Sequence, residues 1–156
     1  MSTAERDACI AINSAMTRLM RQIRRVDERQ GVGRARLSAL AVLHFGGACS
    51  LTELANAEMV SRATMHHVVA GLEGDRLVTR TTDPADARRH IVTLTRKGRR
   101  IITNAQAARI NYLEGLLAEQ AGSDTHTRTE TPTAEELAIT AQTMLKLRDA
   151  AARAAT

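Results

Sequence analysis

The stretch that decides the fold lies between Ser50 and Gly98 and reads SLTELANAEMVSRATMHHVVAGLEGDRLVTRTTDPADARRHIVTLTRKG. Its first four residues, Ser50-Leu51-Thr52-Glu53, form a capping box, in which a hydroxyl and a carboxylate three positions apart satisfy free amides at a helix start. A second helix start follows at Ser61, after the short link Glu58-Met59-Val60. Two capped helices joined by so short a link predict a helix-turn-helix.

The second half of this stretch predicts a charged β-hairpin, the wing. Residues 77–80 (Leu-Val-Thr-Arg) and 90–94 (His-Ile-Val-Thr-Leu) have the composition of strands, and Asp83-Pro84 marks the turn between them. A helix-turn-helix followed by a basic wing is used chiefly to grip duplex DNA. We therefore expect a mainly α fold: a winged helix-turn-helix with a two-stranded β-wing, flanked by N- and C-terminal dimerisation helices.

The composition favours a helical protein with a small core. The 156 residues include one Phe, one Tyr and no Trp, so the core must be aliphatic and rich in alanine. Alanine, leucine and arginine all favour helices. The length suits a single domain, and a core so poor in large side chains often gains burial by oligomerisation.

Positive charge is concentrated in the part of the chain that carries the wing. The formal net charge is +5, and 20 of the 22 basic residues are arginine. Between Arg62 and Arg109 there are ten basic residues and four acidic ones. Arginine suits bidentate contacts with phosphate and guanine, so this distribution favours double-stranded DNA as the partner. The alternative is a solvated, helix-favouring surface in a protein from an arginine-rich proteome.

Long helices with apolar stripes are predicted on both sides of this stretch. One covers residues 4–30, a second covers 34–45, and a third resumes after Gly98. A last helix begins at Thr133, beyond a polar loop at 121–133. Its stripe is Leu137, Thr140, Met144, Leu147 and Ala151, and that of the first helix is Ile12, Met16, Leu19, Ile23 and Val26.

These stripes predict how the chain is organised. We expect one domain, 1–156, in which residues 34–97 form the DNA-binding region. Residues 4–30 and 98–155 form a helical dimerisation region, where the stripes pair within a subunit and across a two-fold axis. The alternative is a monomer in which the stripes close the core.

A helical projection of residues 62–75, at about 100° per residue, separates a core face from a DNA-reading face. Met65, Val68 and Leu72 cluster within about 60° and are expected to be buried. The opposite face has few acids, and its polar groups crowd the N-terminal half, which recognition helices place against base edges. The expected DNA-binding residues of this helix are Ser61, Arg62, Thr64, His66 and His67.

These side chains suit different contacts. The fork of Arg62 matches O6 and N7 of guanine. His66 and His67 could donate to phosphates or to purine N7. The hydroxyls of Ser61 and Thr64 could bond phosphate or cap the helix, and for Ser61 we favour a plain N-cap.

The wing supplies a second set of expected DNA contacts. Residues 83–89 are expected to form the tip of the hairpin. Arg88 or Arg89 would enter the adjacent minor groove, where narrow A·T-rich tracts have enhanced negative potential. Asp86 can brace an arginine two residues away and orient it outward. A purely structural Asp86–Arg88 ion pair is the alternative.

The remaining patterns argue against other classes of protein. No apolar run approaches the ~20 residues that span a bilayer, and residues 1–7 are polar, so we expect no membrane partner and a cytoplasmic location. Cys9 and Cys49 form neither a CxxC pair nor a thiolate zinc site. His66 and His67 point about 100° apart and do not chelate one ion well. We expect no metal, no cofactor and no enzymatic activity, because no nucleophile–base pair or glycine-rich phosphate loop is visible.

Several of these segments resemble the MarR family of bacterial transcription regulators. They are Leu51-Thr52-Glu53-Leu54-Ala55, Ser61-Arg62-Ala63-Thr64-Met65, Leu72-Glu73 with Leu77-Val78-Thr79-Arg80, Asp83-Pro84-Ala85-Asp86-Ala87-Arg88 and Val92-Thr93-Leu94-Thr95-Arg96-Lys97-Gly98. The resemblance implies a winged-helix homodimer that binds a palindromic operator, usually as a repressor. A small phenolic or lipophilic ligand, bound between the head and dimer regions, would release it. By position, the resemblance places Arg62, Thr64, His66 and His67 on the recognition helix and Arg88 at the wing tip.

Two features depart from the family pattern. Where relatives commonly have glycine after the recognition helix, this chain has Arg76, with Gly74 two places earlier. A non-glycine residue in the left-handed conformation costs about 1–2 kcal/mol, so we expect the helix to end earlier. His66 and His67 replace the usual small hydroxyl and basic residues, so the operator sequence cannot be borrowed from relatives.

Two alternative functions follow from the same residues. Cys9 is similar in position to the sensing cysteine of the family's organic-hydroperoxide sensors, which would make this a thiol-based peroxide-sensing regulator. Those sensors support the thiol with tyrosines; here Tyr112 is the only tyrosine, and Arg6 is the nearest cation in sequence. The other alternative is a non-specific architectural DNA-binding protein, which uses the same charge without choosing an operator.

Overall fold

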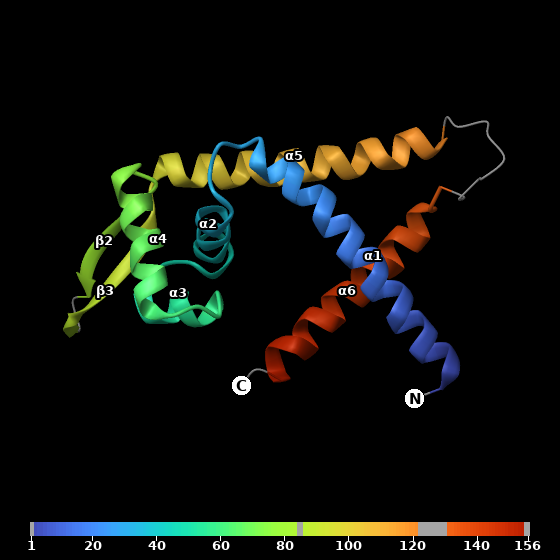
Figure 1. Ribbon diagram of the computed structural model, residues 1–156, viewed down its shortest axis with the longest axis horizontal. Helices are drawn as coiled ribbons and strands as arrows, with labels where there is room; N and C mark the ends of the chain where they lie inside the picture. The colour runs from blue at the N-terminus through green and yellow to red at the C-terminus, as the bar shows by residue number, and fades with distance from the viewer. Residues whose placement is uncertain (1, 84–85, 122–130, 155–156) are drawn as a thin grey trace. The chain divides into compact units, whose positions relative to one another are not determined.

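Six helices and three strands follow one another along the described part of the chain (Figure 1). The computed structural model describes residues 2–83, 86–121 and 131–154, and of residues 87, 88 and 119–121 it describes the backbone only. The elements are α1 (Thr3–Glu28), α2 (Arg34–Gly46), β1 (Cys49–Ser50), α3 (Leu51–Ala57), α4 (Arg62–Gly74), β2 (Val78–Asp83), β3 (Asp86–Leu94), α5 (Arg96–Ala121) and α6 (Ala134–Ala154). The chain divides after Tyr112 into two compact units.

Side chains cap the two helices of the helix-turn-helix where the sequence marks their starts. At α3, Ser50 Oγ accepts from the amide of Glu53 at 3.2 Å, and the Glu53 carboxylate accepts from the amide of Ser50 at 2.8 Å. At α4, Ser61 Oγ accepts from the amide of Thr64 at 3.0 Å. The predicted capping box and the predicted N-cap are both confirmed, because each depends on residues only three positions apart.

The three strands form one antiparallel sheet in the order β1-β3-β2. The hairpin of β2 and β3 is the predicted wing, although β3 begins at Asp86, four residues earlier than expected. The short strand β1 was not predicted, since two residues carry no alternation to recognise. Its pairs, Cys49 with Val92 and Ser50 with Ile91, bring the first turn of α3 beside β3.

An aliphatic core lies among α2, α3, α4, the sheet and the first turns of α5. Figure 1 shows α2, α3 and α4 gathered beside the hairpin. The buried apolar residues are Leu37, Ala39, Leu40, Leu43, Leu54, Ala55, Met65, Val69, Leu72, Leu77, Val78, Val92, Ile102 and Ala105. Each large side chain buried there contributes about 1.5–3 kcal/mol relative to its exposed state.

Helix α4 turns Val69, rather than Val68, fully into this core. Met65 and Leu72 are buried as expected, Val69 is 0% exposed, and Val68 only packs partly against the core. The projection could not separate the two valines, because each lies about 50° from the midpoint of Met65 and Leu72. The packing of α4 against α2, α3 and β2 made the choice.

Arg76 adopts the left-handed conformation directly after α4, with φ of 59°. The amide of Leu77 donates to the carbonyl of Leu72 at 2.8 Å, and the amide of Arg76 donates to that of Glu73 at 2.9 Å. These two bonds form a Schellman motif, which glycine usually completes. The helix ends at Gly74, as expected. Arg76, which is not a glycine, nevertheless adopts the left-handed conformation.

Replacing Arg76 with glycine is expected to raise the free energy of unfolding by about 1 kcal/mol. Relief of the positive-φ strain outweighs the extra freedom that glycine gives the unfolded chain. Urea denaturation measures the change, and Arg76→Ala is the matched control because it removes the charge and keeps the strained Cβ. Equal stability of the glycine and alanine variants would contradict this account.

The long helices at the two ends of the chain leave apolar side chains uncovered. None of the described residues of α1 or α6 is buried. The exposed large apolar side chains are Ile10, Met16, Leu19 and Met20 on α1, and Leu137, Ile139, Met144, Leu145 and Leu147 on α6. The predicted capping box of α6 is present, with Glu136 accepting from the amide of Thr133 at 2.7 Å. No helix within the described ranges is both long and apolar enough to cross a membrane.

Candidate nucleic-acid interface

The N-terminal half of α4 presents exposed polar side chains. Arg62, Thr64, His66 and His67 are all exposed, and they begin directly after the cap at Ser61. The hydroxyls of Ser61 and Thr64 also hydrogen-bond each other at 2.8 Å, so both help to hold the helix start. Arg62 and the two histidines remain as the long side chains of this face that can reach a base edge.

Two polar contacts from α2 fix the orientation of the helix-turn-helix. Arg36 Nη1 lies 2.5 Å from Asp75 Oδ2 at the C-terminal end of α4. Its side chain crosses Gly71, where a Cβ would overlap the guanidinium group. Ser38 Oγ donates to Glu58 Oε1 at 2.8 Å and so holds the end of α3. Both helices of the motif are therefore anchored on the same neighbour.

Arg89 joins the wing to α3. Its Nη2 donates to both carboxylate oxygens of Glu53 at 2.8 Å, and its Nε lies 3.7 Å from Asp83 Oδ2. The sequence suggested Arg89 as a minor-groove contact at the hairpin tip, but the structure places it within β3 and beside two carboxylates. Its guanidinium group is thus paired with two carboxylates of the same chain, on a side chain that remains exposed.

The very tip of the wing falls outside the described residues. Pro84 and Ala85 lie there, and so does the side chain of Arg88. The expected role of Arg88 in the minor groove, and its pairing with Asp86, both remain predictions.

The carboxylate of Glu53 is held in its charged form. Hydrogen bonds from the backbone and side chain of Ser50, and then from Arg89, lower its pKa from 4.5 to about 2. A carboxyl whose pKa is lower in the folded state stabilises the fold above its unfolded pKa and loses that contribution as the pH falls. Its contacts are therefore complete at neutral pH, and the stability that they add is lost as the pH falls from about 4.5 to about 2.

A second ion pair joins the wing to the recognition helix. Arg80 Nη2 on β2 lies 2.5 Å from Glu73 Oε2 on α4, and the two side chains are 20% and 32% exposed. The wing is therefore tied to α3 by Arg89 and to α4 by Arg80.

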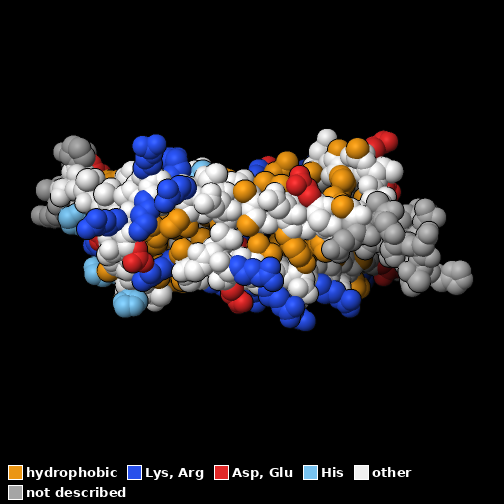
Figure 2. Space-filling view, turned by 90° about the horizontal axis from the view of Figure 1, so that it is seen from above, with side chains coloured by type: hydrophobic (Ala, Val, Ile, Leu, Met, Phe, Trp, Pro, Cys, Tyr) orange, Lys and Arg blue, Asp and Glu red, His pale blue; other side chains and the backbone are white. Residues whose placement is uncertain are grey.

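The first turns of α5 add exposed positive charge. Arg96, Arg99 and Arg100 are exposed, and Lys97 Nζ donates to the carbonyl of Asp75 at 2.9 Å. Within the described chain, none of these four cations forms an ion pair with a carboxylate. Figure 2 shows Lys and Arg side chains close together on the face turned to the viewer, with few acidic ones among them. Such an excess attracts a polyanion over a distance.

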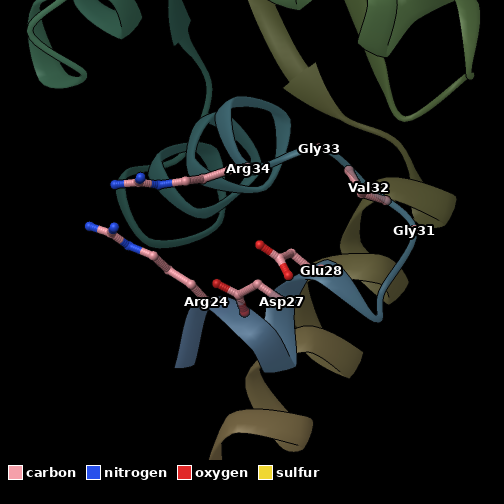
Figure 3. A pocket seen from close by; sticks show the side chains of 7 residues that line it. All are labelled: Arg24, Asp27, Glu28, Gly31, Val32, Gly33 and Arg34. Atoms are coloured by element: carbon pink, nitrogen blue, oxygen red, sulfur yellow. The ribbon is translucent and has the colours of Figure 1, made fainter. Parts of the chain in front are cut away.

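A hollow of about 390 Å³ lies where α1 passes into α2 (Figure 3). Arg24 and Arg34 extend along one side of it, and the carboxylates of Asp27 and Glu28 point into it. Asp27 also accepts a bidentate pair of bonds from Arg109 on α5, at 2.6 and 2.9 Å. The hollow thus adjoins a contact between α1 and α5 whose two residues are 82 positions apart in sequence.

The two cysteines have different surroundings. Cys9 is a free cysteine, exposed on α1. Cys49 is half-buried in β1, where burial and then the charge of Glu53 raise its pKa, against a smaller opposing effect of Arg89. Among the described residues, no three His, Cys, Asp or Glu side chains gather to hold a metal ion.

The sequence of this winged helix-turn-helix matches a known family model over residues 33–90, that of the MarR family. The chain is also 33% identical, over 107 residues, to the HTH-type transcriptional regulator MT0903.1 of Mycobacterium tuberculosis (strain CDC 1551 / Oshkosh). That match covers 69% of this chain and 75% of the relative. The chain belongs to the MarR family. Members of the MarR family are transcriptional regulators. The resemblance to this family that the sequence motifs indicated is therefore confirmed.

Solved structures of MarR-type proteins share the fold over nearly the whole chain. A MarR family protein from Bacillus stearothermophilus superimposes with a TM-score of 0.79 at 20% identity, covering 97% of this chain and 99% of that one. NadR in complex with 4-hydroxyphenylacetate superimposes with a TM-score of 0.71 at 20% identity, covering 94% and 91%. The fold class predicted from the sequence is therefore confirmed.

The matched MarR region contains every predicted DNA-binding residue, since all lie between Ser61 and Arg89. The structure brings Arg62, His66 and His67 onto one exposed helix end and turns Arg89 toward Glu53 instead. Sequence reasoning missed this last contact. Its partners are 36 residues apart, and Glu53 already had a local explanation as a cap.

Proposed function

We propose that this MarR-family protein is a homodimeric repressor that binds a palindromic operator and is released by a small-molecule effector. The observation that carries the proposal is the exposed end of α4, where Arg62, His66 and His67 stand clear of any described ion pair, next to a wing tied to the same helices. In a dimer, two such ends would enter successive major grooves about one helical turn apart. Arg88 would reach the minor groove from the wing tip.

The terminal helices support the dimer. Neither α1 nor α6 buries any described residue, yet each carries several large apolar side chains. Exposed apolar surface of this kind is typical of an interface between subunits. We therefore assign residues 34–97 to DNA binding and residues 4–30 and 98–155 to dimerisation. Light scattering should give twice the mass of one chain, whereas a monomer would contradict this assignment.

The hollow between α1 and α2 supports the effector. Its volume of about 390 Å³ suits a small organic molecule. Its lining carries both signs of charge, which favours a ligand with polar groups over a purely lipophilic compound. Arg24 and Arg34 suit an acceptor such as a carboxylate, and Asp27 and Glu28 suit a donor such as a phenolic hydroxyl. NadR, which shares the fold, was solved in complex with 4-hydroxyphenylacetate. Binding beside the Asp27–Arg109 pair would let the effector act on the contact between α1 and α5.

Selection of duplexes from a random pool tests operator choice. The wild-type protein should enrich one palindromic sequence and bind it about 10³-fold more tightly than random duplex at physiological salt. Equal affinity for selected and random duplexes would instead favour the architectural DNA-binding protein. A ligand screen that reverses operator binding then identifies the effector.

A further inference from the structure

The carboxylate of Glu53 serves two structural elements at once. It accepts from the amide and the hydroxyl of Ser50, both at 2.8 Å, and so caps α3. It also accepts from Arg89 of β3, at 2.8 Å to each oxygen. One side chain therefore sets the start of the helix-turn-helix and holds the wing against it.

The contact between Glu53 and Arg89 matters because the backbone pairing of β2 with β3 is interrupted near the turn of the hairpin. Thr82 pairs with His90, but the next pair is Asp83 with Asp86, so residues 87–89 of β3 fall between two consecutive pairs. An irregularity of this kind bends a strand and increases its twist. The orientation of the two strands at this point therefore depends on side-chain contacts, and Arg89 makes contacts there that reach α3.

The surroundings of Arg89 make it a weak phosphate ligand. Carboxylates of Glu53 and Asp83 lie within 4 Å of its guanidinium group and offset its charge. The Arg89 side chain is 43% exposed, so water could solvate its charge. The two carboxylates are therefore not there to neutralise a buried cation.

We propose that Arg89 is a positioning residue, which Glu53 holds so that β2 and β3 keep their orientation toward the groove, and that Arg89 does not itself contact DNA. This inference rests on the proposed operator binding. It predicts an unusual sign: removing the negative charge of Glu53 from a DNA-binding surface weakens DNA binding. A direct phosphate contact by Arg89 requires the opposite, because Glu53 would then compete with DNA for the guanidinium group.

Fluorescence anisotropy with a duplex selected by the wild-type protein tests the inference. Glu53→Gln keeps a capping residue and loses the ion pair, and Arg89→Gln loses the same pair from the other side. Each should weaken binding by about threefold to tenfold for a protein with two wings. The double variant should be no weaker than either single variant. The slope of log affinity against log salt should stay unchanged, since a lost phosphate contact lowers it by about one per contact.

Glu58→Gln is the matched control, because Glu58 lies at the end of the same helix and the amide oxygen of glutamine can still accept the hydrogen bond from Ser38 that holds α3. It should leave affinity unchanged or slightly higher. Tighter binding by Glu53→Gln, or a lower salt slope for Arg89→Gln, would overturn the inference.

A measurement without DNA separates this inference from the proposed function. In the free protein, Glu53→Gln should speed amide hydrogen exchange at Thr82 and His90 by about threefold or more, with α4 unaffected. If exchange in the wing is unchanged, Glu53 does not hold the wing, and the inference is wrong whether or not an operator is found. If no operator is enriched while the wing loosens, the proposed function fails instead.

Discussion

Replacing Gly98 with alanine is expected to lower the free energy of unfolding by about 3 kcal/mol or more. A Cβ at this position would overlap the carbonyl oxygen of Leu77 and lie 3.3 Å from Leu94 Cδ2. The oxygen is backbone and cannot swing aside. It also accepts from the amide of Thr95 at 3.0 Å and from its hydroxyl at 3.1 Å, so moving it would break the junction between β2 and α5. Overpacking costs about 1–3 kcal/mol, and each lost hydrogen bond adds about 1 kcal/mol.

Urea or thermal denaturation measures this loss, and Gly115→Ala is the matched control. Gly115 lies in the same helix, where a Cβ would meet no described heavy atom within 4 Å. Alanine there should stabilise the protein by up to about 1 kcal/mol, because glycine disfavours a helix interior. A Gly98→Ala variant as stable as the wild type would show that β2 and α5 are less closely packed than the structure has them.

Replacing Arg62 with alanine is expected to weaken operator binding by about 2–6 kcal/mol for a homodimer, since a base-reading arginine is worth about 1–3 kcal/mol per subunit. Arg62 is the first residue of α4 and is exposed, and no described carboxylate pairs with it. Its loss should relax specificity as well as affinity, because phosphate contacts do not distinguish sequences.

The ratio of affinities for selected and random duplexes measures this effect. Arg99→Ala removes the same charge from α5, away from the predicted reading face, and should leave that ratio unchanged. If Arg62→Ala also keeps the wild-type ratio, Arg62 supplies charge only and does not read a base.

The helix starts and the general fold could be predicted because their causes are local. The hydroxyls of Ser50, Ser61 and Thr133 each satisfy an amide three residues away, so the signal lies within one turn of the chain. The exposed polar face of α4 could be predicted from helical periodicity, which needs only the order of residues. The family resemblance relied on the same contiguous motifs.

The contacts that orient these elements could not be predicted, because their partners are distant in sequence. Glu53 and Arg89 are 36 residues apart, and Asp27 and Arg109 are 82 apart. The sequence offers many possible carboxylate partners for each arginine. Only the packing of the folded chain decides which of them lies close enough to form an ion pair.

The order of residues was therefore sufficient for where helices begin, which faces are apolar, and which family the chain belongs to. Tertiary structure decided that Val69 rather than Val68 fills the core, that β1 adds a third strand, and that Arg89 pairs with Glu53 of α3. The division has a physical reason. Capping and periodicity involve neighbours within four residues, whereas side-chain pairing across the core depends on distances that exist only after the backbone has folded.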